Sequence, residues 1–215
     1  MKMLVALLLT LFSAVPAPAA EREPWRWTDE ERLAARFNPE SIRERREEHH
    51  KEQLARNPKA RTPSPTENII DGTRNPELLL PWELFQTFVM RTLSDDSPAR
   101  EPNRCRYAKL APWIAGEPEF WSRLETAALP FTDAIERSRE SGRIERESGI
   151  PPAPEEASDS CRSRLVALEA AREAFGRERF DEFLYTAVAP GGIRFADGDG
   201  APTPSRLLWI ARGCR

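Results

Sequence analysis

The chain has 215 residues, of which 40% are hydrophobic and 31% are charged, so it can form one core with additional solvated segments. Lysine and arginine together number 32, and aspartate and glutamate number 35, which gives a formal net charge of −3. This balance favours neither nucleic acid nor an anionic membrane surface as a partner.

The N-terminus has the pattern of a secretory signal peptide. Lys2 precedes an unbroken apolar run over residues 3–9, and the small residues Ala17 and Ala19 occupy the two positions that a signal peptidase reads. The apolar region is too short for a spanning helix, which needs about 20 apolar residues. We therefore expect residues 1–19 to be removed, which places the protein in the periplasm or outside the cell, with no integral membrane segment after cleavage.

The first part of the mature chain, residues 20–56, is predicted to be a charged helical arm. Trp25 and Trp27 lie in a short lead-in, and a threonine and a glutamate at capping-box spacing predict a helix over residues 28–37. A second helix, over residues 39–56, has many charged side chains and almost no apolar face. Such an arm is either simply solvated or becomes ordered on contact with a partner, such as an envelope protein or a glycan.

Residues 57–66 hold three prolines and no apolar side chain larger than alanine, so they predict a semi-extended linker. We expect the main helical domain to comprise residues 67–215. After a turn at residues 68–72, an Asn-Pro pair starts a helix that Pro81 restarts. Apolar side chains then recur at three- and four-residue spacing and predict a buried helix face, formed by Trp82, Phe85, Phe88, Val89 and Leu93.

Prolines interrupt the middle of this domain. Residues 94–118 contain four prolines and predict irregular structure with a turn of helix. Residues 119–129 and 130–141 predict two short helices that meet at Pro130. A further proline-rich, acidic stretch, residues 150–160, predicts a connection to the last helices.

The C-terminal part is again helical by its pattern. A helix starts at Ser158 or Asp159, and beyond a break at Gly176 a second one covers residues 178–188, with apolar side chains at helical spacing in both. A loop then leads to a final helix over residues 204–212. The sequence therefore predicts an all-α fold, an irregular helical bundle with Pro-rich connections and a charged N-terminal helical arm.

The three cysteines, Cys105, Cys161 and Cys214, can form one disulfide in an exported chain and leave one thiol over. Three pairings are possible. We favour Cys161 with Cys214 because both flank the C-terminal helical unit, where a bridge would hold a terminus that could otherwise fray. A helix N-terminus could instead make Cys161 a reactive thiolate.

Histidine-dependent chemistry has little support, because His49 and His50 are the only histidines in the sequence. As neighbours in a helix they point about 100° apart. The spacing from Glu47 to His50 matches half of a di-iron carboxylate site, but no second half exists. Zinc-hydrolase, Cys-x-x-Cys and G-x-S-x-G patterns are absent, and adventitious metal binding at the two histidines stays open.

The acidic patterns are unspecific. If Asp197 were the first ligand of a calcium loop, Leu208 would occupy the place of the bidentate glutamate, so residues 197–200 predict a surface loop. Adjacent acids such as Glu155 and Glu156 could serve a glycosidase, but a chain with 35 acids contains many accidental pairs. We expect no catalytic residue, no metal and no cofactor.

Two segments carry a resemblance to known proteins. They are IDGTRNPELLLPWELFQTFV, at residues 70–89, and RFDEFLYTAVAP, at residues 179–190, followed by the terminal pair Gly213 and Cys214. They resemble segments of uncharacterised exported bacterial proteins with a DGxxNPELLxP helix start and an FLYxxVAP segment. The resemblance implies export and a helical fold, and it implies no site residues.

These observations lead to two functional hypotheses. We expect a non-enzymatic envelope or interaction protein in which the Trp25 and Trp27 lead-in and the charged arm engage a partner. The alternative is a carboxylate-dependent, glycan-active hydrolase, which would need a deep cleft with two acids about 5 to 10 Å apart. A secreted effector or inhibitor is a third class, which the sequence does not describe further.

Overall fold

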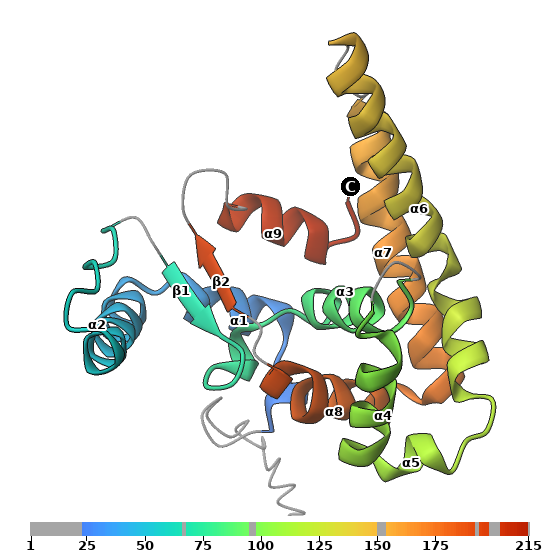
Figure 1. The fold of residues 1–215 in the computed structure, drawn as a ribbon, viewed down its shortest axis with the longest axis horizontal. Helices are drawn as coiled ribbons and strands as arrows, with labels where there is room; N and C mark the ends of the chain where they lie inside the picture. The colour runs from blue at the N-terminus through green and yellow to red at the C-terminus, as the bar shows by residue number, and fades with distance from the viewer. Residues whose placement is uncertain are drawn as a thin grey trace, which may run out of the picture.

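The computed structural model describes residues 23–65, 68–94, 98–149, 154–191, 194–197 and 203–214. The predicted signal peptide and residues 198–200 of the predicted surface loop lie outside these ranges. The fold is all-α, as expected (Figure 1). Its helices are α1 (Asp29–Arg36), α2 (Pro39–Arg56), α3 (Pro81–Thr92), α4 (Arg100–Leu110), α5 (Pro112–Ala115), α6 (Phe120–Ser148), α7 (Pro154–Phe175), α8 (Arg177–Phe183) and α9 (Pro204–Ala211).

Several short elements join these helices. The 3₁₀ turns are η2 (Pro24–Arg26), η3 (Pro76–Leu78) and η5 (Ala189–Gly191), and η4 (Leu184–Val188) is a π-helical turn that continues α8. The strands β1 (Asn68–Asp71) and β2 (Arg194–Asp197) form one antiparallel pair.

The core is built around α3, which contacts α4, α7 and η4. The predicted apolar face of this helix is confirmed, since Phe85 and Phe88 are fully buried and Trp82 is 6% exposed. Phe88 makes edge-on ring contacts with Tyr107 of α4 and Phe183 of α8, at centroid distances of 5.1 Å and 5.0 Å. This face of α3 therefore packs as part of the core.

The longest helices, α6 and α7, form an antiparallel pair that extends beyond the rest of the molecule (Figure 1). The prediction of two short helices meeting at Pro130 was wrong, because α6 continues through this residue. A proline inside a helix costs about 3 kcal/mol. Here Ala127 and Ala128 before the proline and Phe131 and Ala134 after it are all buried, so packing of one continuous face offsets the lost hydrogen bond.

The region from residue 94 to 118 is also more helical than predicted. Pro102 is the third residue of α4, in the first turn, where an N–H would have no partner within the helix. Burial of Tyr107, which is 1% exposed, then anchors the helix against α3. The prolines in this segment therefore sit near helix starts and do not prevent helix formation.

Residues 68–71 form a strand where we predicted a turn. Ile70 of β1 lies opposite Phe195 of β2, and Ile69 opposite Ala196, in an antiparallel register. The two paired strands lie far apart in the sequence, so the local residue pattern did not indicate that they pair. The helix end at Gly176 and the final helix are confirmed, with positive φ angles of 84° at Gly176 and 89° at Gly213.

The structure differs from the expected separation of an arm, residues 20–56, from a domain, residues 67–215. Helix α1 contacts η3 and α9, and its Leu33 belongs to the buried core. Trp25 is half-buried and packs against the same core. Only α2 keeps the expected character, since it has no buried residue.

The disulfide between Cys161 and Cys214 is confirmed, with a Cα–Cα distance of 6.3 Å. Both cysteines are buried, whereas Cys105 is a free and exposed thiol on α4. The bridge fastens the end of the segment that follows α9 to the side of α7.

Candidate functional site

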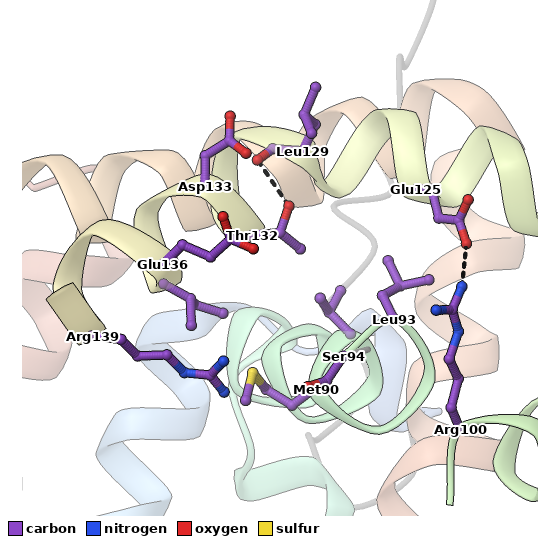
Figure 2. Close-up of a pocket in the computed structure, with 12 residues that line it drawn as sticks. Met90, Leu93, Ser94, Arg100, Glu125, Leu129, Thr132, Asp133, Glu136 and Arg139 are labelled. Atoms are coloured by element: carbon purple, nitrogen blue, oxygen red, sulfur yellow. Dashed lines mark hydrogen bonds and ion pairs between the residues drawn. The ribbon is translucent and has the colours of Figure 1, made fainter. Parts of the chain in front are cut away.

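A groove of about 640 Å³ runs between α3 and α6 and ends near the start of α4 (Figure 2). Its floor is apolar, because Val89 and Leu93 of α3 lie there with 1% and 9% exposure. Leu129 of α6 borders the groove with 54% of its surface exposed. The groove therefore offers apolar contact area to a molecule outside the chain.

The rim of the groove is charged. At one end, Arg100 donates to Glu125 over 3.0 Å, and Arg104 donates to the same carboxylate oxygen over 2.6 Å. Asp133 and Glu136 lie further along α6 and are exposed (Figure 2). Within the described residues neither of these two carboxylates forms an ion pair, and with Arg139 as the one cation beside them this part of the lining carries a net negative charge.

The continuity of α6 creates this arrangement. Leu129, Asp133 and Glu136 are spaced four and three residues apart and so share one face of the helix. From Glu125 to Arg139 the wall covers four helical turns, about 21 Å at 1.5 Å per residue. The groove was not predicted from the sequence, because the expected break at Pro130 placed Leu129 and Asp133 in different helices. The helical spacing itself was visible in the sequence.

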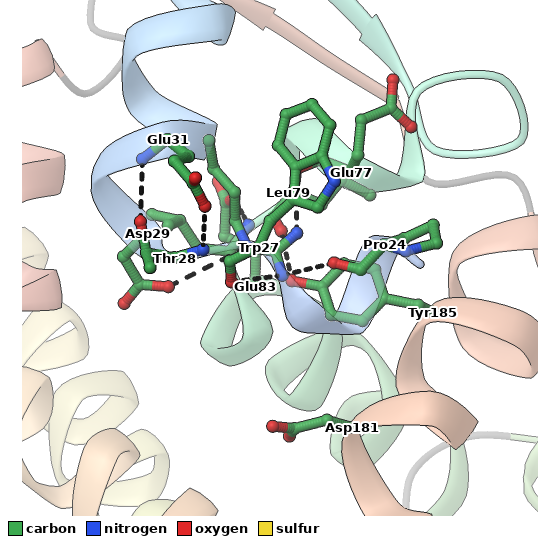
Figure 3. A network of polar contacts seen from close by, with 12 residues as sticks. Pro24, Trp27, Thr28, Asp29, Glu31, Glu77, Leu79, Glu83, Asp181 and Tyr185 are labelled. Carbon is green, nitrogen blue, oxygen red and sulfur yellow. Dashed lines mark hydrogen bonds and ion pairs between the residues drawn. The ribbon is translucent and has the colours of Figure 1, made fainter. Parts of the chain in front are cut away.

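A second polar feature, the Arg32 network, is buried near the N-terminus (Figure 3). Arg32 is 1% exposed and donates to the carbonyl oxygens of Pro24, Trp27 and Glu77 over 2.7 Å, 3.1 Å and 2.8 Å. Its guanidinium lies 4.3 Å from the ring centroid of Tyr185. Because three carbonyls and a ring surround it, this cation ties the lead-in to the domain and is not available to a ligand.

Tyr185 completes the network from the other side. Its hydroxyl donates to the carbonyl oxygen of Leu79 over 2.6 Å, and complete burial raises its pKa well above the usual value. The π-helical turn η4 contains this tyrosine, together with three other buried residues. A π-helical turn can mark a functional site, but here its tyrosine is held inside the core.

Two buried ion pairs lie near this network. Arg36 donates to both carboxylate oxygens of Glu83 over 3.0 Å and 3.1 Å, and these two side chains are 1% and 4% exposed. Arg172 donates to both carboxylate oxygens of Asp181 over 2.8 Å and 2.9 Å. Each carboxylate is thus engaged by a guanidinium, which suits a structural role better than proton transfer.

Asp29 provides a test of how burial affects the acids of this region. Burial raises the pKa of its carboxyl group above 3.8, although Arg32, with its Nε 4.0 Å away, opposes the effect. The folded state then binds the proton more tightly than the unfolded chain, so the free energy of unfolding falls as the pH rises through the folded-state pKa. We expect Asp29→Asn to reduce this fall in urea unfolding measured from about pH 4 to about pH 7.

The control for this measurement is Glu44→Gln, which changes an exposed acid on α2. This variant should keep the pH dependence of the unmodified protein. Identical profiles for the Asp29→Asn and Glu44→Gln variants would contradict the assignment.

The histidines do not contribute to the groove. His49 and His50 lie on α2, where Nε2 of His49 is 2.6 Å from Nε2 of Gln53. Neither histidine lines the groove, and Cys105 is exposed on α4. Among the described residues, no group of three or more His, Cys, Asp or Glu side chains could hold a metal ion.

No protein-family model, curated protein or solved structure matches this chain. The resemblance to exported bacterial proteins therefore stays a prediction. In the part of the chain that the structure describes, no helix has both the length and the apolar character needed to cross a membrane.

Proposed function

We propose that this chain is an exported, non-enzymatic interaction protein that binds a polypeptide partner in the groove between α3 and α6. The observation that carries the proposal is the apolar part of the groove's lining, where the half-buried Met90 and Ile135 lie beside the exposed Leu129. Exposed apolar surface in a concave site with a polar rim is typical of a binding site for another chain. The signal-peptide pattern and a buried disulfide both fit a compartment outside the cytoplasm.

Charge complementarity selects the kind of partner. Asp133 and Glu136 outnumber Arg139 at this end of the groove and form no ion pair among the described residues, so a segment with lysine or arginine next to apolar side chains would fit. The rim at the other end is already neutralised by the pair of Arg100 and Glu125. The proposed occupant is therefore an apolar segment with basic residues concentrated at the end that faces Asp133 and Glu136.

The groove replaces the lead-in as the proposed contact surface. Trp25 packs against the core, and Arg32 holds the carbonyl oxygens of Pro24 and Trp27, so the lead-in is part of the fold. Helix α2 is exposed but lies against β1, where Arg74 forms ion pairs with Glu48 and Glu52. The exposed apolar residue of this arm, Leu54, is 39% exposed on a helix with few other apolar side chains, whereas Leu129 lies in a groove with further apolar residues.

A glycan-active hydrolase is less well supported by this geometry. Two catalytic acids must face each other across the scissile bond, and one of them must be shielded to stay protonated. Asp133 and Glu136 project from the same face of one helix and are both exposed. They can attract a cation but are not arranged to act as an acid and base pair.

The proposal predicts that a groove variant loses binding while a matched surface variant does not. Leu129→Glu should weaken binding of a fluorescein-labelled, amphipathic Leu/Lys peptide at least about tenfold, since burying a leucine contributes about 1.5 to 3 kcal/mol. Fluorescence anisotropy with the disulfide-bonded mature chain measures this change. Val166→Glu is the control, because Val166 is 50% exposed on α7 and does not line the groove.

The charge of the peptide tests the rim separately. A Leu/Glu peptide of the same length should bind less tightly than the Leu/Lys peptide, and the Asp133→Lys/Glu136→Lys variant should reverse that preference. If the Leu/Lys peptide does not bind the unmodified protein, or binds both glutamate variants equally well, the groove is not the binding site.

A further inference from the structure

A partly buried arginine lies at the junction of α3, α6 and α7, away from the groove. Arg164 of α7 places its guanidinium carbon 4.8 Å from the ring centroid of Trp82 and 5.6 Å from that of Phe131. Stacking on aromatic rings holds a guanidinium in place and leaves its edge free to bind. Neither Arg164 nor Trp82 lines the groove of the proposed function.

The charges around Arg164 do not balance. Burial lowers the pKa of its guanidinium, Glu83 opposes this effect, and Arg206 of α9 adds to it by repulsion. Glu83 is already occupied, because Arg36 donates to both of its oxygens and the Leu80 N–H donates to one of them over 2.8 Å. In the described ranges no carboxylate forms an ion pair with Arg164 or Arg206, so two positive charges remain at this junction.

Two donors of the same stacked pair also lack acceptors. Nε of Arg164 and Nε1 of Trp82 are shielded from solvent and have no hydrogen-bond partner. Trp82 is 6% exposed, and a buried N–H without a partner costs about 1 to 3 kcal/mol. Arg32 and Arg36 also leave Nε unbonded, but each donates through its terminal nitrogens. Arg164 differs because its guanidinium donates no hydrogen bond within the described part of the chain.

We propose that Arg164, stacked on Trp82 and flanked by Arg206, binds an oxyanion group of a small ligand. A planar guanidinium donates two parallel hydrogen bonds to a carboxylate or a phosphate, and an arginine is better suited to this than a lysine. The anion neutralises part of the excess charge and accepts from the terminal nitrogens of Arg164, which are not among the atoms shielded from solvent. This site is separate from the groove, so it does not depend on the proposed polypeptide partner.

The test is the thermal unfolding of the disulfide-bonded mature chain in sodium phosphate, sodium acetate and sodium chloride at equal ionic strength. A ligand that binds only the native state raises the unfolding midpoint as its concentration passes the Kd. We expect phosphate, acetate or both to raise the midpoint and to change tryptophan emission, whereas chloride does neither. A response to phosphate alone assigns the site to phosphate-bearing ligands, and a response to acetate alone assigns it to carboxylates.

Variants separate a built site from general salt effects. Arg164→Gln should abolish the shift, and Arg164→Lys should raise the Kd at least about tenfold because the paired hydrogen bonds are lost. Arg206→Gln changes an exposed side chain, so it should fold normally and raise the Kd several-fold. Arg143→Gln is the control, because Arg143 is exposed and already paired with Glu140 and Glu147.

Two results overturn the proposal. If none of the oxyanions acts beyond chloride, Arg164 binds no anion. If Arg164→Gln and Arg206→Gln respond like Arg143→Gln, an adventitious ion only is bound.

Discussion

Arg36→Ala should lower the free energy of unfolding by about 3 to 5 kcal/mol, the range found when one partner of a buried ion pair is removed. The Glu83 carboxylate would stay buried at 4% exposure, with the Leu80 N–H as its remaining donor among the hydrogen bonds described above. Burying a charge without its partner is costly because the protein interior solvates it poorly. Urea unfolding followed by far-ultraviolet circular dichroism measures the loss.

Two controls isolate the buried charge. Arg26→Ala breaks the ion pair between Arg26 and Glu178, two side chains that are 60% and 70% exposed. This change should lower the free energy of unfolding by less than about 1 kcal/mol. The double change Arg36→Met/Glu83→Leu removes both charges and should recover much of the loss, apart from about 1 kcal/mol for the missing cap at Leu80. An equal fall in the free energy of unfolding for Arg36→Ala and Arg26→Ala would show that the buried ion pair stabilises the fold no more than the exposed one.

Removing the disulfide should have the second-largest effect. Cys161→Ala/Cys214→Ala opens a link between residues 53 apart in sequence and is expected to lower the free energy of unfolding by about 2 to 4 kcal/mol. The bridge restricts the unfolded chain and holds the segment after α9, whose Leu207 and Ile210 are buried. Guanidinium unfolding with tryptophan fluorescence measures the difference.

The third cysteine provides the control for this experiment. Cys105→Ala replaces an exposed thiol and should leave the unfolding midpoint unchanged. Reduced unmodified protein should resemble the double variant. A double variant as stable as the Cys105→Ala chain would mean that α9 is held by its apolar contacts alone.

These stability effects bear on the proposed function. The α3–α6 groove depends on α3 staying fixed in the core, and Glu83 both caps this helix and pairs with Arg36. A loss of binding in Arg36→Ala would therefore report on the fold, whereas a loss in Leu129→Glu reports on the groove, because Leu129 is 54% exposed. Both variants need a measured unfolding curve before their binding is compared.

Local sequence pattern determined much of the helical framework. The apolar repeat of Trp82, Phe85 and Phe88 placed the core helix, because period alone decides which side of a helix is buried. Gly176 marked a helix end, since glycine adopts positive φ without strain. The disulfide was also predictable, because only three cysteines exist and two of them flank one helical unit.

Only the tertiary structure decided where proline could be tolerated and where charge could be buried. Helix α6 passes through Pro130 because buried residues on both sides of it pack on α7, and such compensation comes from another part of the chain. The groove beside Leu129 and Asp133 exists only because of that continuity. Arg32 has the sequence context of a surface charge, yet it is buried because backbone carbonyls of the preceding turn and of the distant Glu77 accept its hydrogen bonds. Residue pattern reports the local preference of a segment, while acceptors and packing partners far away in sequence become known only when the chain is folded.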